Sequence, residues 1–162
     1  MKLALTPSLL SAVLLAGPAA AQSSAGPVKP PHGIFAQLLV DRFVRDHPEL
    51  TALELAVTTA GGCRTVAATA PEDVGENCDA DELGPIRTGK PDVEVPSKAD
   101  PVYDITQALH DATHHLIGAA GMDRRPQTGP TRAAVVKRAR ELLRALEAQI
   151  PSKARLLETA IP

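Results

Sequence analysis

The chain has 162 residues and a formal net charge of −2, with 17 basic and 19 acidic side chains, and this length suits one domain. It contains two phenylalanines, one tyrosine and no tryptophan, so the aromatic platforms on which proteins stack single-stranded nucleic acid are essentially missing. We therefore expect an aliphatic core and no nucleic-acid partner.

The first 21 residues are typical of a secretory signal peptide. Lys2 precedes an apolar run from Leu3 to Ala16, and Ala19-Ala20-Ala21 offers the small residues that precede a cleavage site. The alternative is an uncleaved membrane anchor, but the run is short for a span and Gly17-Pro18 interrupts it. We predict cleavage after Ala21, a periplasmic or secreted protein, and no membrane span after cleavage.

Residues 22–31 are small, polar and proline-rich, which predicts a flexible lead-in to a single domain over residues 32–162. A helix is expected over residues 33–47, where Pro48 stops it. Its apolar side chains recur at helical spacing: Ile34, Phe35, Leu38, Leu39 and Phe43.

Two strands should follow this helix. Leu53, Leu55 and Val57 alternate with less apolar residues, Gly61-Gly62 forms a turn, and residues 63–69 form the paired strand. Residues 71–101 are rich in proline, glycine and acid, and a loop of that length is often functional. Within it we expect a short helix near residues 79–87 and a short strand at 93–95.

The second half predicts two more strands and a long helix. Between residues 102 and 109, Tyr103, Ile105 and Leu109 alternate with Asp104, Thr106 and Ala108. Residues 116–122 form a strand rich in glycine and alanine, and residues 131–150 form a helix that ends at Pro151. The apolar stripe of that helix comprises Val135, Val136, Ala139, Leu142, Leu143, Leu146 and Ile150. The predicted fold class is α+β: an antiparallel sheet of about five strands with the N-terminal and C-terminal helices packed on it.

Two cysteines, Cys63 and Cys78, form the only possible internal pair. Two buried free thiols are the alternative, but an exported protein meets an oxidising compartment. We predict a disulfide that ties the second strand to the acidic segment.

Three of the five histidines, His110, His114 and His115, lie beside Asp111. In one interpretation they belong to the tip of a hairpin, because an Asp side chain can bond back to the backbone of a turn. In the other they bind a transition-metal ion, for which imidazole is a suitable ligand. We favour the turn, with strands that end near Leu109 and restart near Leu116, and keep metal binding as the alternative function.

Residues 124–155 are basic, with nine lysines and arginines against two glutamates. Nucleic acid or anionic lipid would suit such a patch. A solvated helix face is the other interpretation, and export and the scarcity of aromatic residues favour it. No nucleophile elbow, phosphate-binding loop, dinucleotide fingerprint or zinc-protease motif occurs, so we expect neither an enzyme nor a cofactor.

Two stretches resemble a known family. "LELAVTTAGGCRTVAATAPEDVGENCDADELGPIRTGKP" and "YDITQALHDATHHLIGAAGMD" are similar to the single Cache domain, an extracytoplasmic PAS-like sensory module of bacteria. "VAATAPEDVGENC" is similar to that family's strand and following "P…vG" loop. "HDATHHLIGAAGMD" is similar to its closing hairpin, D-x-x-G-x-x-I-G, with His114 in the place of the usual glycine. The resemblance spans roughly residues 34–123, most of the chain after the leader.

The resemblance implies an N-terminal helix, a five-stranded antiparallel sheet, and a pocket between the sheet and the long mid-chain loop. It also implies binding of a small molecule, often a carboxylate, amino acid or amine. No membrane helix or output domain follows in the sequence, so we expect ligand binding to carry over, with a membrane signalling protein as a possible partner.

Four residues are candidates for the ligand site: Arg87, Tyr103, Asp104 and Asp123. Arg87 could clamp a carboxylate or pair with the surrounding acids, and Asp123 could hold an amine. Which face of the strand from Val102 lines the pocket stays open. The small residues Gly118, Ala120 and Gly121 could leave space above the sheet or let a helix approach closely.

Overall fold

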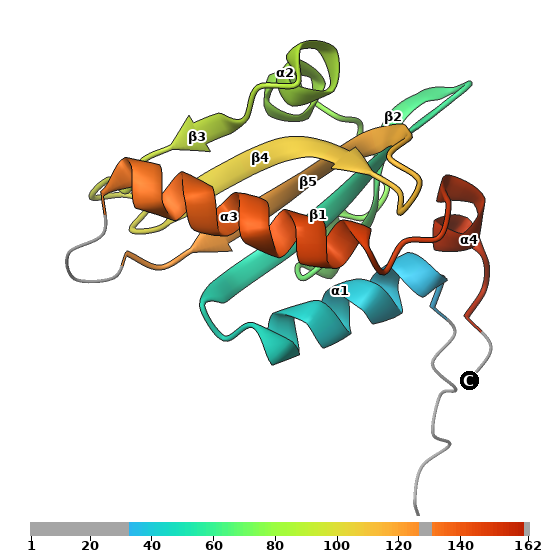
Figure 1. Cartoon of the computed structure of the whole chain (residues 1–162), viewed down its shortest axis with the longest axis horizontal. Helices are drawn as coiled ribbons and strands as arrows, with labels where there is room; N and C mark the ends of the chain where they lie inside the picture. The colour runs from blue at the N-terminus through green and yellow to red at the C-terminus, as the bar shows by residue number, and fades with distance from the viewer. Residues whose placement is uncertain (1–32, 127–130, 161–162) are drawn as a thin grey trace, which may run out of the picture. The chain divides into compact units, whose positions relative to one another are not determined.

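A computed structural model describes residues 33–126 and 131–160, so the predicted signal peptide and lead-in lie outside the described residues. The elements in chain order are α1 Phe35–Asp46, β1 Leu50–Thr59, β2 Gly62–Ala68, the 3-10 turn η1 Pro71–Asp73, α2 Ala80–Thr88, β3 Asp92–Glu94, β4 Tyr103–His110, β5 Leu116–Arg124, α3 Arg132–Glu147 and α4 Lys153–Leu157 (Figure 1).

The strands form one antiparallel sheet in the order β2-β1-β5-β4-β3. The last strand, β5, therefore lies between β1 and β4 and joins the two halves of the chain. This arrangement confirms the predicted α+β fold class with one antiparallel sheet of five strands. The short helix and short strand expected within the acidic segment are also present, as α2 and β3.

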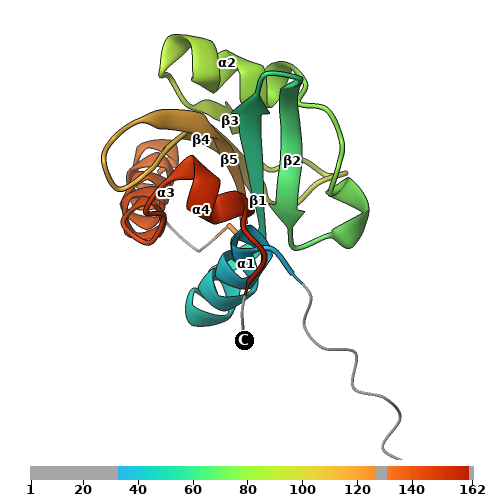
Figure 2. The ribbon, with the colours of Figure 1, turned by 90° about the vertical axis from the view of Figure 1, so that its right-hand side faces the viewer.

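Helices lie on both faces of the sheet (Figures 1 and 2). α1, α3 and α4 pack on one face, where a cluster of aliphatic side chains forms the main core. Its largest fully buried members include Leu39, Leu53, Leu55, Leu109, Met122, Leu142, Leu146, Ile150 and Leu156. α2 lies on the opposite face, against β4 and β5. The apolar residues that alternate along β1 and β4 therefore lie on the face of the sheet that α1 and α3 cover.

The segment that carries α2 is fixed by local bonds. Asp79 caps α2, with its side chain accepting from the Asp81 backbone N–H and Glu82 bonding back to the Asp79 N–H, both at 2.8 Å. A disulfide joins Cys63 of β2 to Cys78, and the Cys78 N–H donates to the Cys63 carbonyl at 3.1 Å. The predicted disulfide is confirmed, and it holds the start of α2 beside the edge of the sheet.

The β4–β5 connection is the predicted hairpin tip. Oδ1 of Asp111 accepts from the backbone N–H of Thr113 at 2.9 Å, from the Thr113 hydroxyl at 2.6 Å and from the His115 N–H at 3.1 Å. The hydrogen bond from Thr113 is the main reason why the pKa of Asp111 is lowered. His114 takes a left-handed conformation, with φ 64°, where the family's glycine was expected.

Two details of the predicted helices are wrong. The C-terminal helix ends at Glu147, and after Pro151 the chain forms α4, in which Ser152 accepts from the Arg155 N–H and Leu156 is fully buried. Leu38 and Val136 do not belong to the core stripes of their helices. Leu38 is 39% exposed, and Val136 lines an open groove described below. In both cases a neighbour in sequence occupies the inward position.

The two glycines of β5 have different surroundings. A Cβ on Gly118 would lie 1.8 Å from the backbone oxygen of Ala56, so here the small residue permits close approach of β1. A Cβ on Gly121 would meet nothing nearer than the Thr106 hydroxyl at 3.6 Å. Gly121 therefore leaves space above the sheet, as one interpretation expected, whereas at Gly118 the close neighbour is a strand and not the expected helix.

We expect Gly118→Ala to destabilise the protein by about 3 kcal/mol or more, because the backbone of β1 must move to relieve the overlap. Gly121→Ala is the matched control and should change the free energy of unfolding by less than about 1 kcal/mol. Urea unfolding of both variants checks this. Equal effects of the two substitutions would contradict the assigned register.

We expect His114→Gly to leave stability unchanged or raise it by up to about 1 kcal/mol, because glycine adopts left-handed angles without the Cβ clash. His115→Gly is the control: its φ is not left-handed, so the added freedom of the unfolded chain should destabilise. Thermal unfolding measures both. A clear loss of stability in His114→Gly alone would show that the imidazole has a structural role.

Candidate functional site

Three carboxylates form a row across neighbouring strands on the face of the sheet that α2 covers. Asp104 of β4 is directly opposite Asp123 of β5 on one side and Glu94 of β3 on the other. Adjacent strands lie about 4.8 Å apart, and like charges directly opposite each other destabilise a sheet. Folding therefore brings together side chains that repel one another when they are ionised.

The next row of the sheet adds a fourth carboxylate and an open space. Thr106, Gly121 and Glu54 are paired across β4, β5 and β1. Gly121 has no side chain to fill the space above it, and Glu54 accepts a hydrogen bond from the Thr65 hydroxyl at 2.5 Å. Thr106 is 4% exposed and lines this space, so it adds a polar side chain to a wall made mostly of carboxylates.

The segment between β2 and β3 forms the roof of this space. Glu82 projects from α2 and Asp73 from η1, and together with the sheet they enclose a cavity of about 210 Å³. The complete lining is Ala52, Leu53, Glu54, Ala68, Thr69, Ala70, Asp73, Glu82, Asp104, Thr106, Gly121 and Asp123. We call this cavity the acidic pocket, because five carboxylates and no lysine, arginine or histidine line it.

The surroundings of the carboxylates favour their neutral forms. Burial, followed by the charges of Asp123 and Glu94, raises the pKa of Asp104 to about 7. Burial is also the largest cause of the raised pKa values of Glu54, Glu82 and Asp123. Four perturbed carboxyl groups around one cavity indicate a functional site, since such groups gather where a protein binds or transforms a ligand.

The structure brings together two of the four residues predicted from sequence. Asp104 and Asp123 line the acidic pocket, whereas Tyr103 points to the other face and packs against Ile105 and Val135. Arg87 is exposed on α2, where its Nε donates to the Leu83 carbonyl, and it does not line the pocket.

Sequence reasoning missed three acidic pocket residues, Glu54, Asp73 and Glu82, and left open whether the face of Thr106 lines the pocket. Glu54 and Thr106 carried a signal, because each stands at the polar position of an alternating strand. The positions of Asp73 and Glu82 depend on the path of the chain after β2, and no short-range pattern indicated it.

The three clustered histidines serve different parts of the hairpin. His110 Nδ1 lies 3.0 Å from Oε1 of Glu147 on α3, and the His115 ring lies 2.8 Å from the Thr113 hydroxyl. Across residues 33–126 and 131–160, no group of three histidine, cysteine, aspartate or glutamate side chains could hold a metal ion. Nor does that part of the chain contain a helix long and apolar enough to cross a membrane.

Five chains of solved structures match this chain in a comparison of folds. No protein-family model matches the chain, and no curated protein matches its sequence. The GAF domain of a two-component sensor histidine kinase from Bacillus halodurans is similar in structure, with a TM-score of 0.48 and 6% sequence identity; the match covers 73% of this chain and 90% of that one. The fold class given above rests on the sheet and helices of the chain itself.

We expect Asp104→Asn to stabilise the protein at pH 8 and to have little effect near pH 4. The unfolded chain has an Asp pKa of about 3.9 and the folded protein one of about 7, so the folded state holds the proton more tightly between these values. Stability of the parent protein should therefore fall as pH rises from about 4 to about 7, and the uncharged Asn removes this loss.

Thermal unfolding from pH 4 to pH 8 measures the difference. Asp46→Asn is the control, because Asp46 is an exposed carboxylate outside the acidic pocket. A constant offset between Asp104→Asn and the parent at every pH would contradict the raised pKa.

Proposed function

We propose that this protein is a small-molecule-binding domain of the PAS-like, Cache-like sensory type, and that its acidic pocket binds a small organic cation. Such a ligand is an aliphatic amine or the ammonium group of an amino-acid-like molecule. The observation that carries the proposal is the row of Glu94, Asp104 and Asp123, which opens into a cavity lined by further carboxylates and by no basic side chain.

An ammonium group supplies the positive charge and the hydrogen-bond donors that the carboxylates of the acidic pocket need. It donates three hydrogen bonds, and its bonds to carboxylates are about twice as strong as those between neutral groups. It also offsets the repulsion between Asp104 and Asp123, so binding recovers free energy lost on folding. A carboxylate ligand would meet only like charge there, because Arg87, the cation expected to clamp it, lies outside the pocket.

Two features favour an organic ligand over a metal ion. Metals need three or more ligands that converge on one point. The described residues provide no such group, whereas an organic cation can span carboxylates on different strands. The cavity of about 210 Å³ is smaller than the roughly 300–1,000 Å³ typical of drug-sized ligands, which suits a compact metabolite.

The location that we propose is extracytoplasmic, in the periplasm or outside the cell. The disulfide between Cys63 and Cys78 supports it, because such bonds persist in oxidising compartments. There the protein would bind its ligand without transforming it, and a membrane signalling protein would read the bound state.

Calorimetric titration with 1,4-diaminobutane tests the proposal, and 1,4-butanediol is the uncharged probe of similar size. We expect the diamine to bind at one site and the diol to give no measurable heat. Asp104→Asn and Asp123→Asn should each weaken diamine binding by about 10- to 100-fold, the effect of losing one charge-assisted hydrogen bond. Binding should strengthen between pH 6 and pH 8 as Asp104 ionises.

Two variants control this titration. Asp46→Asn removes an exposed charge at the end of α1, outside the lining of the acidic pocket, and should leave binding unchanged. Gly121→Leu keeps all the carboxylates but fills the space above β5, and should abolish binding. Diamine binding that persists in Asp104→Asn, Asp123→Asn and Gly121→Leu would refute the proposal. Binding of Ca²⁺ by the parent protein that is lost in the same three variants would also refute it.

A further inference from the structure

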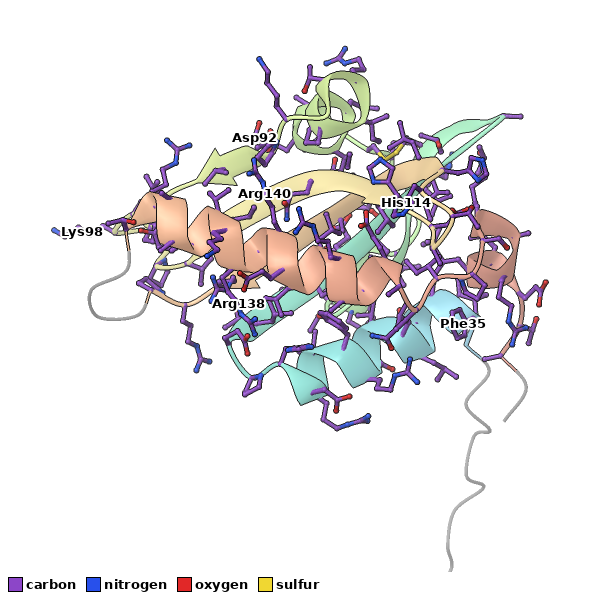
Figure 3. The ribbon with its side chains drawn as sticks, in the orientation of Figure 1. Phe35, Asp92, Lys98, His114, Arg138 and Arg140 are labelled. Atoms are coloured by element: carbon purple, nitrogen blue, oxygen red, sulfur yellow. A yellow bond between two sulfur atoms is a disulfide. The ribbon has the colours of Figure 1, made fainter. Side chains whose placement is uncertain are left out.

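The basic residues of α3 lie on two sides of the helix with different surroundings. Arg138 extends toward the start of β1, where its guanidinium pairs with Glu49 at 2.7 Å. Arg140 extends to the other side, toward β3 and Asp92 (Figure 3). The basic run in the sequence is therefore not one uniform solvated face.

A groove separates α3 from β3. Its volume is about 810 Å³, and its lining comprises Pro91, Val93, Arg132, Ala133, Val136, Lys137, Arg140, Glu141 and Arg144. A second hollow of about 210 Å³ shares Pro91, Arg140 and Arg144 with it and extends along β4 to His110 and Glu147. We call the two together the basic groove. Its walls combine apolar side chains with four cations, and its volume is that of a typical ligand site.

Several polar groups of the basic groove lack partners. Among the described residues, Lys137, Arg140 and Arg144 have no carboxylate within 4.0 Å, and Glu141 pairs with Arg138 instead. Gln107 lines the second hollow and is 5% exposed, and its buried Nε2 finds no acceptor in the described part of the chain. A buried donor without an acceptor costs free energy, so an acceptor oxygen at this position would be stabilising.

We propose that the basic groove binds a soluble organic anion that has an apolar body, such as an alkyl carboxylate or an alkyl phosphate. Arg140 and Arg144, one helical turn apart, hold the anionic head, and the amide of Gln107 donates to it. Val93, Val136 and Pro91 contact the apolar body.

The shape of the basic groove favours a small molecule over a membrane surface or a long polymer. One end is bounded by Arg132, whose Nη2 donates to the Val93 carbonyl at 3.2 Å. The other end is bounded by the His110–Glu147 pair. A bilayer is flat on this scale and would not enter a hollow between a helix and a strand.

Calorimetric titration with octanoate and octyl phosphate tests this site. Inorganic phosphate carries the charge without the apolar body, and 1-octanol carries the body without the charge. We expect saturable binding of octanoate or octyl phosphate, and binding at least about tenfold weaker for both controls. The double variant Arg140→Gln/Arg144→Gln should weaken binding by at least about tenfold, since it removes charge-assisted contacts from an exposed surface without touching the core.

The control is Arg45→Gln/Arg125→Gln, which removes the same charge from exposed positions outside the groove and should leave the affinity unchanged. Val136→Gln should weaken octyl phosphate binding but not the residual binding of inorganic phosphate. Equal affinities in the two double variants would overturn the proposal. So would binding only to vesicles of phosphatidylglycerol and phosphatidylcholine, with no response to either soluble anion.

Discussion

The pairing of β1 with β5 is the contact on which the rest of the structure depends, because it joins the β1–β2 and β4–β5 hairpins into one sheet. A two-stranded hairpin alone is marginal in water, whereas the joined sheet supports the aliphatic core under α1 and α3. The pairing also fixes which side chains share a face. A slip of one residue would turn Asp123 into the core, so burial of Leu53, Leu55 and Met122 determines where the carboxylates must lie.

The acidic pocket exists at the expense of stability. Asp104 is flanked by acidic residues on both neighbouring strands, and an uncharged residue there would fold more easily. Such a conflict between local chemistry and folding is expected where a residue serves binding. The roof over the pocket does not depend on a ligand for its position, since the capping bonds of Asp79 and Glu82 and the disulfide to Cys63 fix it independently. The carboxylates are therefore held in place without a ligand, which would reduce the entropy cost of binding the proposed cation.

The sequence was sufficient for features set by near neighbours. Alternation in β1 and β4, the short helix that begins near Asp79, the single cysteine pair and the turn at Asp111 all depend on residues a few positions apart or on compartment. The sequence was insufficient where tertiary packing determines which of several similar side chains is buried or lines a site. Nothing local distinguishes Val135, which is buried, from Val136, which lines a groove, or shows that Arg87 lies outside the acidic pocket. The separation of Arg138 from Arg140 likewise depends on what lies on each side of α3, and only the sheet order determines that.

The sheet separates the acidic pocket from the basic groove, a division that a net charge of −2 conceals. Strand β4 contributes to both sites through its period of two: Asp104 and Thr106 face the acidic pocket, and Gln107 faces the basic groove. If the cations of α3 lay on the same face of the sheet as Asp104, they would form ion pairs with the carboxylates of the acidic pocket. Neither group would then need a ligand to compensate its charge. Because the packed sheet lies between them, each set keeps its unmet charge. The cation and the anion that we propose would then bind to one small domain without competing for the same side chains.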